Sequence, residues 1–499
     1  MKKQYSLGCD IGSSSIKVSL LDLRSGETIA SDYSPKKEMT IQARFPGWAE
    51  QNPDTWWDNL VLATRTIIKQ SNGNALDIIS IGISYQMHGL VMLDKNQEVL
   101  YPSIIWCDSR AISIGDVIMN DLGYDHCLSN YLNSPGNFTI SKLKWIKDNE
   151  PDIFSKIDKI ILPGDYIAYK LTGEISTTIP GLSEGVFWNF KNQALATDLM
   201  DYCEFPKSII PEITDTFGHQ GKLSKEAAME TGLEKGIPVS YRAGDQPNNA
   251  FSLNAIKSGE FAATAGTSGV VYGVSSQPIP DEGLRVNIFA NVNYSIDYPV
   301  YGVLLCINGT GILNSWLKNT LFSGNISYEE MNLKAEKINM GSDGLRIFPF
   351  GNGTERMLNN SNQGAQVLGL DFNLHTRDHV MRAVQEGIAN AFRYGIDLLN
   401  DLDLQPKVIR AGNTNLFLSP LFCEVFTNVC NTPIEIYNTD GAQGAARGAA
   451  FGSGFYESMD DALKNLKMIK SYEPDSGLSD RYDVYYQAWK EQLQAQLQQ

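Results

Sequence analysis

The chain has few of the features that mark several common classes of protein. Its 499 residues include 41 lysines and arginines against 57 aspartates and glutamates, a formal net charge of −16. Surfaces that bind nucleic acid or anionic membranes need clustered basic residues, so this balance argues against both partners. A phosphate ligand stays possible, because backbone N–H groups can hold phosphate. No apolar run approaches the length of a membrane span.

Cysteine and histidine are also scarce. The seven cysteines are dispersed and include no C-x-x-C pair, which favours a reducing, cytoplasmic location over a disulfide framework or a zinc site. Cys423 and Cys430 fall on an expected helix, and we predict that both are buried. With only five histidines, the composition argues against a His-rich metal centre. The N-terminal "MKKQYSLGCDIG" breaks its apolar stretch at Asp10, unlike a signal peptide.

The motifs of the best-known nucleotide-binding and hydrolytic enzymes are missing. The sequence contains neither G-x-x-x-x-G-K-[ST] nor G-x-G-x-x-G. Their absence argues against the common nucleotide-binding folds that carry these motifs. It also lacks H-E-x-x-H and G-x-S-x-G, which argues against a metalloprotease or an esterase.

Strand and helix patterns alternate along the chain. We expect a helix end and a buried strand over 75–84, a strand and a short helix over 158–173, and a strand, turn and helix over 407–426. In 379–400, apolar residues recur at intervals of three, four or seven and predict an amphipathic helix. Regions 130–140 and 350–365 are predicted loops. The alternation indicates α/β layers in both halves, with a boundary near residue 250.

Two stretches half a chain apart resemble each other. "YSLGCDIGSSSIKVSLLDL" (5–23) and "EFAATAGTSGVVYGVSS" (260–276) both predict a strand, a Gly/Ser turn and a second strand. Any β-rich protein has such hairpins, so one hairpin alone is weak evidence for a particular architecture. Their equivalent placement indicates two domains of one architecture, each with a turn of small hydroxyl residues that phosphate oxygens can approach closely.

A single acid stands in "YRAGDQPNNAF" (241–251), just after the strand-like "GIPVSY". Asp245 has Arg242 as its one basic neighbour in sequence. Gly-Asp is a common turn pair, so these residues alone predict a turn aspartate that bonds its own loop.

Eight stretches in order carry a family resemblance: "GCDIGSSSIK", "GISYQMHGLVMLD", "WCDSR", "DYIAYKLTGE", "AGDQPNNAF", "ATAGTSGVVYG", "GLDFNLHTRDHVMRAVQEGIANAF" and "IRAGNTNLFLSPLF". Over about residues 5–455 the chain resembles the FGGY carbohydrate kinases, and most closely those that act on xylulose. The resemblance implies two actin-like (ribonuclease H-like) domains with an interdomain cleft for ATP and sugar. Residues 1–250 would carry the sugar site and first phosphate loop, and 251–499 the second phosphate loop and adenosine site.

The resemblance also assigns the reacting groups. Asp245 corresponds to the general base, and Asp10 to a catalytic carboxylate that orients Mg²⁺ through water. A turn-stabilising contact is the alternative role for Asp10. The substrate-binding residues would be Gln86, Met87, His88, Trp106, Asp245 and Gln246. His88 and Trp106 could equally be ordinary core residues.

Contacts with ATP would come from both turns and from two later loops. The implied residues are Gly12, Ser13, Ser14, Lys17, Gly266, Thr267, Ser268, Gly309, Gly311, Gly412 and Asn413. Lys17 has a solvated strand-end lysine as its alternative. Three stretches depart from the family pattern: "GDQPNN" at Gln246, "GNGTERML" (351–358) and "AGNTNLF" (411–417).

The expected activity is ATP- and Mg²⁺-dependent phosphorylation of a ketose at its terminal hydroxyl, with D-xylulose giving D-xylulose 5-phosphate. The rivals are another sugar or polyol kinase of the family, such as a ribulokinase, gluconokinase or fuculokinase, and a non-catalytic actin-like nucleotide-binding regulator. The partners are then a small sugar and ATP. The sequence leaves the oligomeric state open, a homodimer included. It also predicts a C-terminal helix over 480–499 that packs on its own molecule or on another copy.

Overall fold

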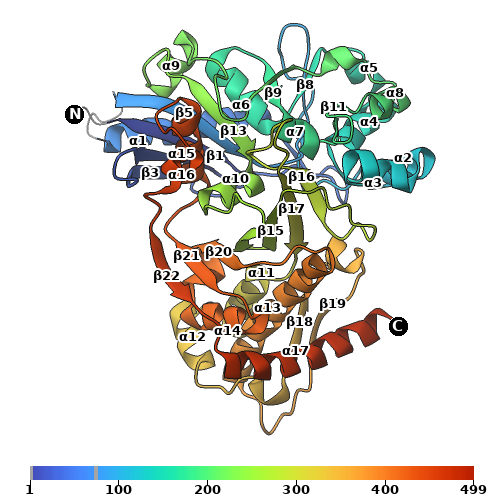
Figure 1. Cartoon of the computed structure of the whole chain (residues 1–499), viewed down its shortest axis with the longest axis vertical. Helices are drawn as coiled ribbons and strands as arrows, with labels where there is room; N and C mark the ends of the chain where they lie inside the picture. The colour runs from blue at the N-terminus through green and yellow to red at the C-terminus, as the bar shows by residue number, and fades with distance from the viewer. Residues whose placement is uncertain (1–3, 72–76, 499) are drawn as a thin grey trace. The chain divides into compact units, whose positions relative to one another are not determined.

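The computed structural model describes residues 4–71 and 77–498. The chain packs into two compact units (Figure 1). The first consists of Met1–Asn254, Ile288–Tyr301 and Thr439–Leu466, and the second of Ala255–Asn287, Gly302–Asn438 and Lys467–Gln499. The main break lies near the expected residue 250. The units are nevertheless interleaved, which a single boundary along the chain does not describe.

The first unit is built on a five-stranded sheet with the order β13-β5-β1-β2-β3. These strands are β1 (Tyr5–Ile11), β2 (Ile16–Asp22), β3 (Thr28–Ser34), β5 (Ile78–Tyr85) and β13 (Val239–Gly244). β1 and β2 form the predicted antiparallel hairpin, and β5 runs parallel to both β1 and β13. The carboxyl ends of β1, β5 and β13 therefore meet at one edge of the sheet.

The two faces of this sheet follow from the alternation along β1. Tyr5, Leu7, Cys9 and Ile11 belong to one core cluster with residues of helices α1 (Pro53–Gln70) and α6 (Pro163–Thr172). The side chains between them must point to the opposite face, because strand residues alternate. That face is covered by helix α15 (Gly441–Gly452), which packs on β1, β5 and β13 (Figure 1).

Glycine in the strands allows α15 to approach closely. A Cβ at Gly8 would lie 1.8 Å from the carbonyl oxygen of Ala442, and one at Gly82 would lie 2.0 Å from that of Ala445. Both distances are much shorter than a van der Waals contact, and the atoms met are backbone atoms that cannot move aside. The small residues of "GAQGAARGAAFG" complete this contact from the helix side. This packing is the physical reason why residues 439–466 belong to the first unit.

The second unit's part of a seven-stranded sheet has the order β17-β15-β14-β20-β21-β22. The strands are β14 (Glu260–Ala265), β15 (Gly269–Ser275), β17 (Tyr301–Ile307), β20 (Val408–Gly412), β21 (Ile434–Tyr437) and β22 (Met468–Tyr472). β14 and β15 form the second predicted hairpin, and β14 runs parallel to β20. A separate antiparallel pair is formed by β18 (Arg346–Phe350) and β19 (Gly364–Leu368).

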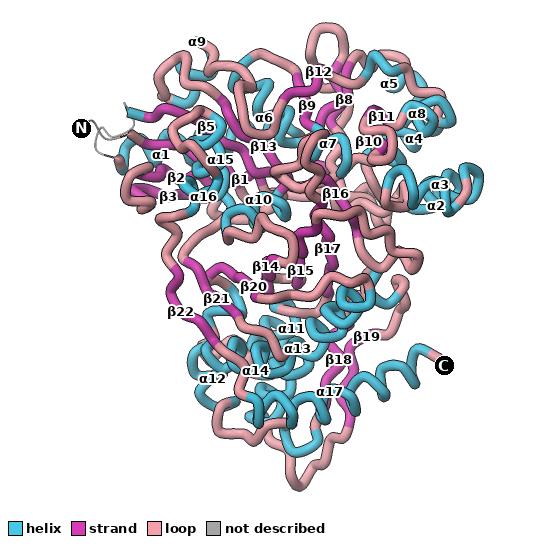
Figure 2. Tube along the Cα trace, viewed as in Figure 1, coloured by secondary structure: helices cyan, strands magenta, loops and turns pink. Residues whose placement is uncertain are grey.

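Helices α12 (Tyr328–Ala335), α13 (Arg377–Asp401) and α14 (Pro420–Cys430) pack beside one another in this unit (Figure 2). The periodic residues of α13 are all buried, as predicted, and are Met381, Val384, Ile388, Phe392 and Leu399. Cys423 and Cys430 are buried on α14, which confirms that prediction.

The C-terminal helix α17 (Ser476–Leu497) docks on its own unit. Tyr486 and Trp489 are fully buried, and the Trp489 indole Nε1 donates to the carbonyl of Ile347 at 3.0 Å. The intramolecular alternative for this helix is therefore confirmed. Across the described residues, every helix is too short or too polar to pass through a membrane.

The remaining strands and helices follow in chain order. They are β4 (Glu50–Gln51), β6 (Val91–Leu93), β7 (Ser103–Ile104), α2 (Ile112–Leu122), α3 (Tyr124–Tyr131), α4 (Thr139–Asn149), α5 (Pro151–Phe154), β8 (Lys159–Ile161), β9 (Ser176–Thr178), α7 (Ile179–Glu184), β10 (Trp188–Asn189), β11 (Ala194–Leu195), α8 (Thr197–Tyr202), β12 (Glu212–Thr214), α9 (Lys225–Thr231), α10 (Asp245–Ser252), β16 (Asn287–Ala290), α11 (Gly311–Trp316) and α16 (Met459–Leu463).

Candidate active site

Asp245 lies at the junction of a strand and a helix. It directly follows β13 and is the first residue of α10, so it occupies a helix start rather than a turn. A carboxylate is favoured there by the helix dipole. Its one basic neighbour in sequence is used elsewhere, because Arg242 Nε pairs with Asp165 Oδ1 at 2.9 Å. No described residue forms an ion pair with Asp245.

The environment of Asp245 changes its acidity. Burial raises the pKa of its carboxyl to about 7, and the negative charge of Asp10 adds to the rise. Hydrogen bonds from the backbone and side chain of Gln246 oppose the rise in part. A carboxylate with a pKa near the working pH is suited to accept a proton from a hydroxyl group.

Asp10 lies at the end of β1, on the face that α15 covers. Ser84 Oγ donates to Asp10 Oδ1 at 2.8 Å, and a Cβ at Gly441 would lie 2.5 Å from Asp10 Oδ2. Burial raises the pKa of this carboxyl, and the nearby Asp440 adds to the effect. The carboxylate is therefore desolvated and incompletely compensated, which a bound cation would relieve.

The first hairpin turn connects β1 to β2. Gly12 N–H donates to the carbonyl of Ser15 at 3.2 Å and closes the turn. Trp106 is half exposed, so it is not a core residue, and its Nε1 donates to Ser13 Oγ at 3.3 Å. Lys17 Nζ pairs with Asp440 Oδ2 at 2.7 Å, so this lysine has a protein partner and is not simply solvated, as the alternative for it had been. Asp10, Ser13, Lys17 and Trp106 thus gather at this turn.

The stretch Gln86–Met87–His88 follows the end of β5. His88 has a φ of 60°, which is unusual for a residue with a side chain. Its ring lies 4.9 Å from that of Phe138 and 5.2 Å from that of Phe289, measured between centroids. A Cβ at Gly244 would lie 2.6 Å from Met87 Cγ, so this glycine lets Met87 lie against the residue before Asp245.

Two amide oxygens at this site lack a partner. Gln86 Oε1 and Gln246 Oε1 are buried and accept no hydrogen bond from any described residue. Buried polar atoms are rarely left unpaired, so such atoms point to a missing ligand or water. Hydroxyl groups of a sugar would supply the missing donors.

The second unit contains a pocket of about 570 Å³ beside its own hairpin turn. It is lined by Ala265, Gly266, Thr267, Gly311, Ile312, Asn314, Ser315, Tyr328, Asn332, Asn415, Leu416, Leu418 and Ser419. Gly311 N–H and Thr310 Oγ1 both donate to the carbonyl of Gly266, at 2.7 and 2.9 Å. The turn and the following loop therefore form one wall, and the volume is sufficient for a nucleoside.

The pocket includes three of the predicted ATP residues, Gly266, Thr267 and Gly311. The predicted residues Ser268, Gly309, Gly412 and Asn413 are not part of its lining. Gly309 supports the wall instead, because a Cβ there would lie 1.5 Å from the carbonyl oxygen of Pro349. Motif matching missed the lining residues on α12 and after β20, since no local sequence signal connects Tyr328 or Leu416 to the turn.

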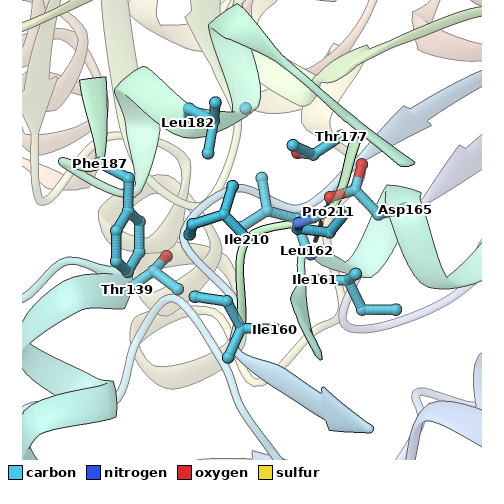
Figure 3. A pocket seen from close by; sticks show the side chains of 11 residues that line it. Thr139, Ile160, Ile161, Leu162, Asp165, Thr177, Leu182, Phe187, Ile210 and Pro211 are labelled. Atoms are coloured by element: carbon cyan, nitrogen blue, oxygen red, sulfur yellow. Dashed lines mark hydrogen bonds between the residues drawn. The ribbon is translucent and has the colours of Figure 1, made fainter. Parts of the chain in front are cut away.

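A smaller cavity in the first unit is lined by Thr139, Asp165 and mostly apolar side chains (Figure 3). Its volume is about 20 Å³, enough for about one water molecule. None of the predicted site residues lines it. It is therefore too small and too apolar to be the sugar site.

The donors for a metal ion are few. In the part of the chain that the structure describes, no cluster of three or more His, Cys, Asp or Glu side chains could hold a metal. Magnesium does not require such a cluster, because it keeps several waters and binds one or two carboxylates together with substrate phosphates. Asp10, with its desolvated carboxylate, fits this mode.

Comparisons with known proteins identify the class to which this fold and site belong. Residues 5–252 match the N-terminal domain, and residues 261–453 the C-terminal domain, of the FGGY family of carbohydrate kinases. The chain belongs to this family, which confirms the resemblance seen in the sequence and the two actin-like (ribonuclease H-like) α/β domains. It is therefore an ATP-dependent sugar kinase.

Individual relatives cover nearly the whole chain. The xylulose kinase of Bacillus subtilis is 28% identical over 493 residues, covering 98% of this chain and 96% of the relative. The ligand-bound crystal structure of xylulose kinase from Lactobacillus acidophilus has a TM-score of 0.88 and 25% identity, covering 99% and 98%. The gluconate kinase from Lactobacillus acidophilus has a TM-score of 0.89 at 24% identity, covering 99% of each chain, and shows the shared fold.

Proposed function

We propose that this kinase transfers the γ-phosphoryl group of ATP to the terminal O5 hydroxyl of D-xylulose, with Asp245 as the general base. The observation that carries the proposal is the carboxyl of Asp245, whose pKa of about 7 suits it to take a proton from a hydroxyl. The xylulose kinases among its near-full-length relatives support the choice of acceptor.

The neighbouring residues would hold the sugar. The unpaired oxygens of Gln86 and Gln246 can accept from hydroxyl groups, Met87 supplies an apolar contact, and the His88 imidazole can hydrogen-bond a hydroxyl. Trp106 is accessible beside Ser13 and can cover the sugar or the phosphate. Each contact fixes the O5 hydroxyl in line for transfer, which is the main task of a phosphotransferase.

The proposal requires ATP to contact both hairpin turns in the working enzyme. The second-unit pocket would take the nucleoside, and Gly266 and Thr267 would approach its phosphates. Gly12, Ser13, Ser14 and Lys17 would contact the transferring end. Mg²⁺, held by Asp10 through water, would supply charge compensation for the phosphates.

The activity is tested by coupled ADP release over a panel of ketoses, aldoses and polyols at fixed MgATP. We expect the highest kcat/KM for D-xylulose, with D-ribulose, gluconate, fuculose and glycerol at least about tenfold lower, since one unpaired buried polar group costs that much or more. A preference for another acceptor would refute the xylulose assignment. ATP binding without acceptor-dependent turnover would refute the kinase assignment and favour a regulator.

The cellular location and the oligomeric state stay predictions. None of the seven cysteines forms a disulfide within the described residues, and five of them are buried, which is compatible with a reducing compartment. A cytoplasmic location is proposed on that basis. A homodimer is also retained as a prediction, to be tested by the mass of the purified protein in solution.

A further inference from the structure

Two buried charged residues that no motif indicates hold the backbone around His88. Glu184 is the last residue of α7, and Lys142 lies on α4. Their side chains are almost fully buried, with relative exposures of 1% and 0%. Acids and lysines are rarely buried without a specific partner, so each of these positions needs an explanation.

Glu184 contacts His88 twice. The backbone N–H of His88 donates to Glu184 Oε1 at 3.2 Å, and His88 Nδ1 lies 2.9 Å from the backbone carbonyl of Glu184. A carbonyl oxygen can only accept, so Nδ1 carries the proton and donates. The ring tautomer is thereby set by the same residue that holds the peptide.

Lys142 holds the other side of the same peptide. Its ammonium donates to the carbonyl of His88 at 2.8 Å and to the carbonyl of Ile105 at 2.9 Å. Ile105 precedes Trp106, so one buried cation connects the two loops that carry proposed substrate residues. Together the three contacts hold His88 in a left-handed conformation that is strained for a residue with a side chain.

Strained residues of this kind persist only where their surroundings fix them, and they gather at functional sites. We infer that Glu184 and Lys142 are positioning residues for sugar binding, which hold His88 and Trp106 in the conformation that the substrate meets. The inference rests on the proposed function, since it assigns a purpose to the placement of His88.

The acidity of Glu184 agrees with this role. Burial raises the pKa of its carboxyl well above the ordinary value, and the negative charges of Asp165 and Asp245 add to the rise. The rise favours the protonated form of the carboxyl over the charged form, and Oε1 accepts the His88 N–H in either form. A glutamine, neutral and of nearly the same shape, keeps the acceptor oxygen.

The experiment compares Glu184→Met with Glu184→Gln in the full-length enzyme. We expect Glu184→Met to raise the KM for the sugar about tenfold or more, the effect of losing one hydrogen bond to a strained peptide, with the KM for ATP within about twofold of wild type. Glu184→Gln should show a clearly smaller rise. A Glu184→Met enzyme with an unchanged sugar KM would overturn the inference.

A double-mutant cycle shows whether Glu184 acts through His88. In a His88→Ala background, Glu184→Met should add much less than it does alone, because the group it positions is gone. Fully additive effects would mean that Glu184 acts independently of His88, and they would overturn the proposal. If the wild-type protein phosphorylates no sugar at all, the proposed function itself is wrong. This result can be told apart from an unchanged sugar KM in Glu184→Met and from additive effects in the cycle.

Matched controls separate positioning from general destabilisation. Glu386 is also a buried carboxylate that accepts a backbone N–H, from Gly341 at 3.0 Å, but it lies in the second unit. Glu386→Met should lower Tm and leave the sugar KM unchanged. For Lys142→Met, the control is Lys144→Met on the same helix, where the ammonium contacts only the carboxylate of Asp148 among described residues. Lys142→Met should raise the sugar KM and Lys144→Met should not.

Discussion

The two hairpin turns share a backbone pattern and differ in charge. In the first, Asp10 stands two residues before Gly12, and Asp440 and Lys17 lie beside it. In the second, the residue two before Gly266 is Thr264, and the pocket beside this turn is lined without any acidic or basic side chain. The same strand–turn–strand unit thus provides charged groups in one half and a neutral wall in the other.

This difference divides the proposed chemistry. A carboxylate that orients a cation and a carboxylate that takes a proton both have to be near the transferring phosphoryl group. A nucleoside, by contrast, needs a concave, mostly uncharged surface with a few polar contacts. The first unit meets the former requirement and the second unit meets the latter, so changes in the two halves should affect different kinetic constants.

The largest effect is expected for Asp245→Asn. It removes the proposed base, and we predict a loss in kcat of about 10²–10⁴-fold, the usual contribution of a positioned base. ATP affinity, measured by calorimetry, should change little, because Asp245 lies in the other unit from the proposed nucleoside pocket.

The control is Asp281→Asn, which changes a buried aspartate paired with Arg285 at 2.8 Å. It should lower Tm without lowering kcat. Turnover near the wild-type level in Asp245→Asn would remove Asp245 from the mechanism.

The next largest loss of kcat is expected for Asp10→Asn. It replaces the proposed metal-orienting carboxylate with a neutral amide, and we predict a kcat about 10²-fold lower together with a higher Mg²⁺ concentration for half-maximal rate. Activity titrated with Mg²⁺ measures both quantities. Asp22→Asn, at the end of β2, is the matched strand-end control, since Asp22 accepts from its own loop. An unaltered Mg²⁺ dependence in Asp10→Asn would contradict the assigned role.

Gly311→Ala should affect ATP binding rather than the chemical step. The added Cβ would lie 2.3 Å from the carbonyl oxygen of Gly266, so the wall of the proposed nucleoside pocket has to shift. Overpacking of this kind costs about 1–3 kcal/mol, and the KM for ATP should rise about tenfold. Gly477→Ala, where the Cβ would be 3.4 Å from Asp475 Oδ1 in an exposed helix start, is the control. A rise in the KM for the sugar without a rise in the KM for ATP would contradict the proposed division of roles between the two units.

The smallest expected effect is on stability. A carboxyl with a raised pKa in the folded protein binds its proton more tightly there than in the unfolded chain, so ionisation destabilises the fold as pH rises from about 4 to about 7. Asp245→Asn removes this cost. Its Tm should therefore exceed that of wild type by a margin that grows between pH 5 and pH 7 and is constant above pH 7. A margin that is the same at pH 5 and pH 8 would show that Asp245 has an ordinary pKa.

Much of the fold could be predicted from the sequence because its signals are local. The alternation in β1, the two hairpins and the periodicity of α13 are each encoded by neighbouring residues. The return of α15 to the first unit could not be predicted, since a Gly/Ala-rich helix does not indicate which sheet it covers. The deciding contacts are with Gly8 and Gly82, several hundred residues earlier in the chain.

The site shows the same limit. Asp10, His88 and Asp245 lie in motifs that resemble the family, and the structure places all three in the first unit. Glu184 and Lys142 contact His88 across 96 and 54 positions of the chain, through a carboxylate and an ammonium that no motif contains. Packing in three dimensions, rather than local pattern, determines what these residues do.

The most direct test of the account is the pH dependence of kcat/KM for the sugar, which reports ionisations in the free enzyme. For the wild type we predict a limb that rises with pH and has its midpoint near 7, because the carboxyl of Asp245 has to lose its proton before it can act. The residual activity of Asp245→Asn should lack this limb. A wild-type profile that stays flat down to pH 5, or the same limb in both proteins, would contradict Asp245 as the base.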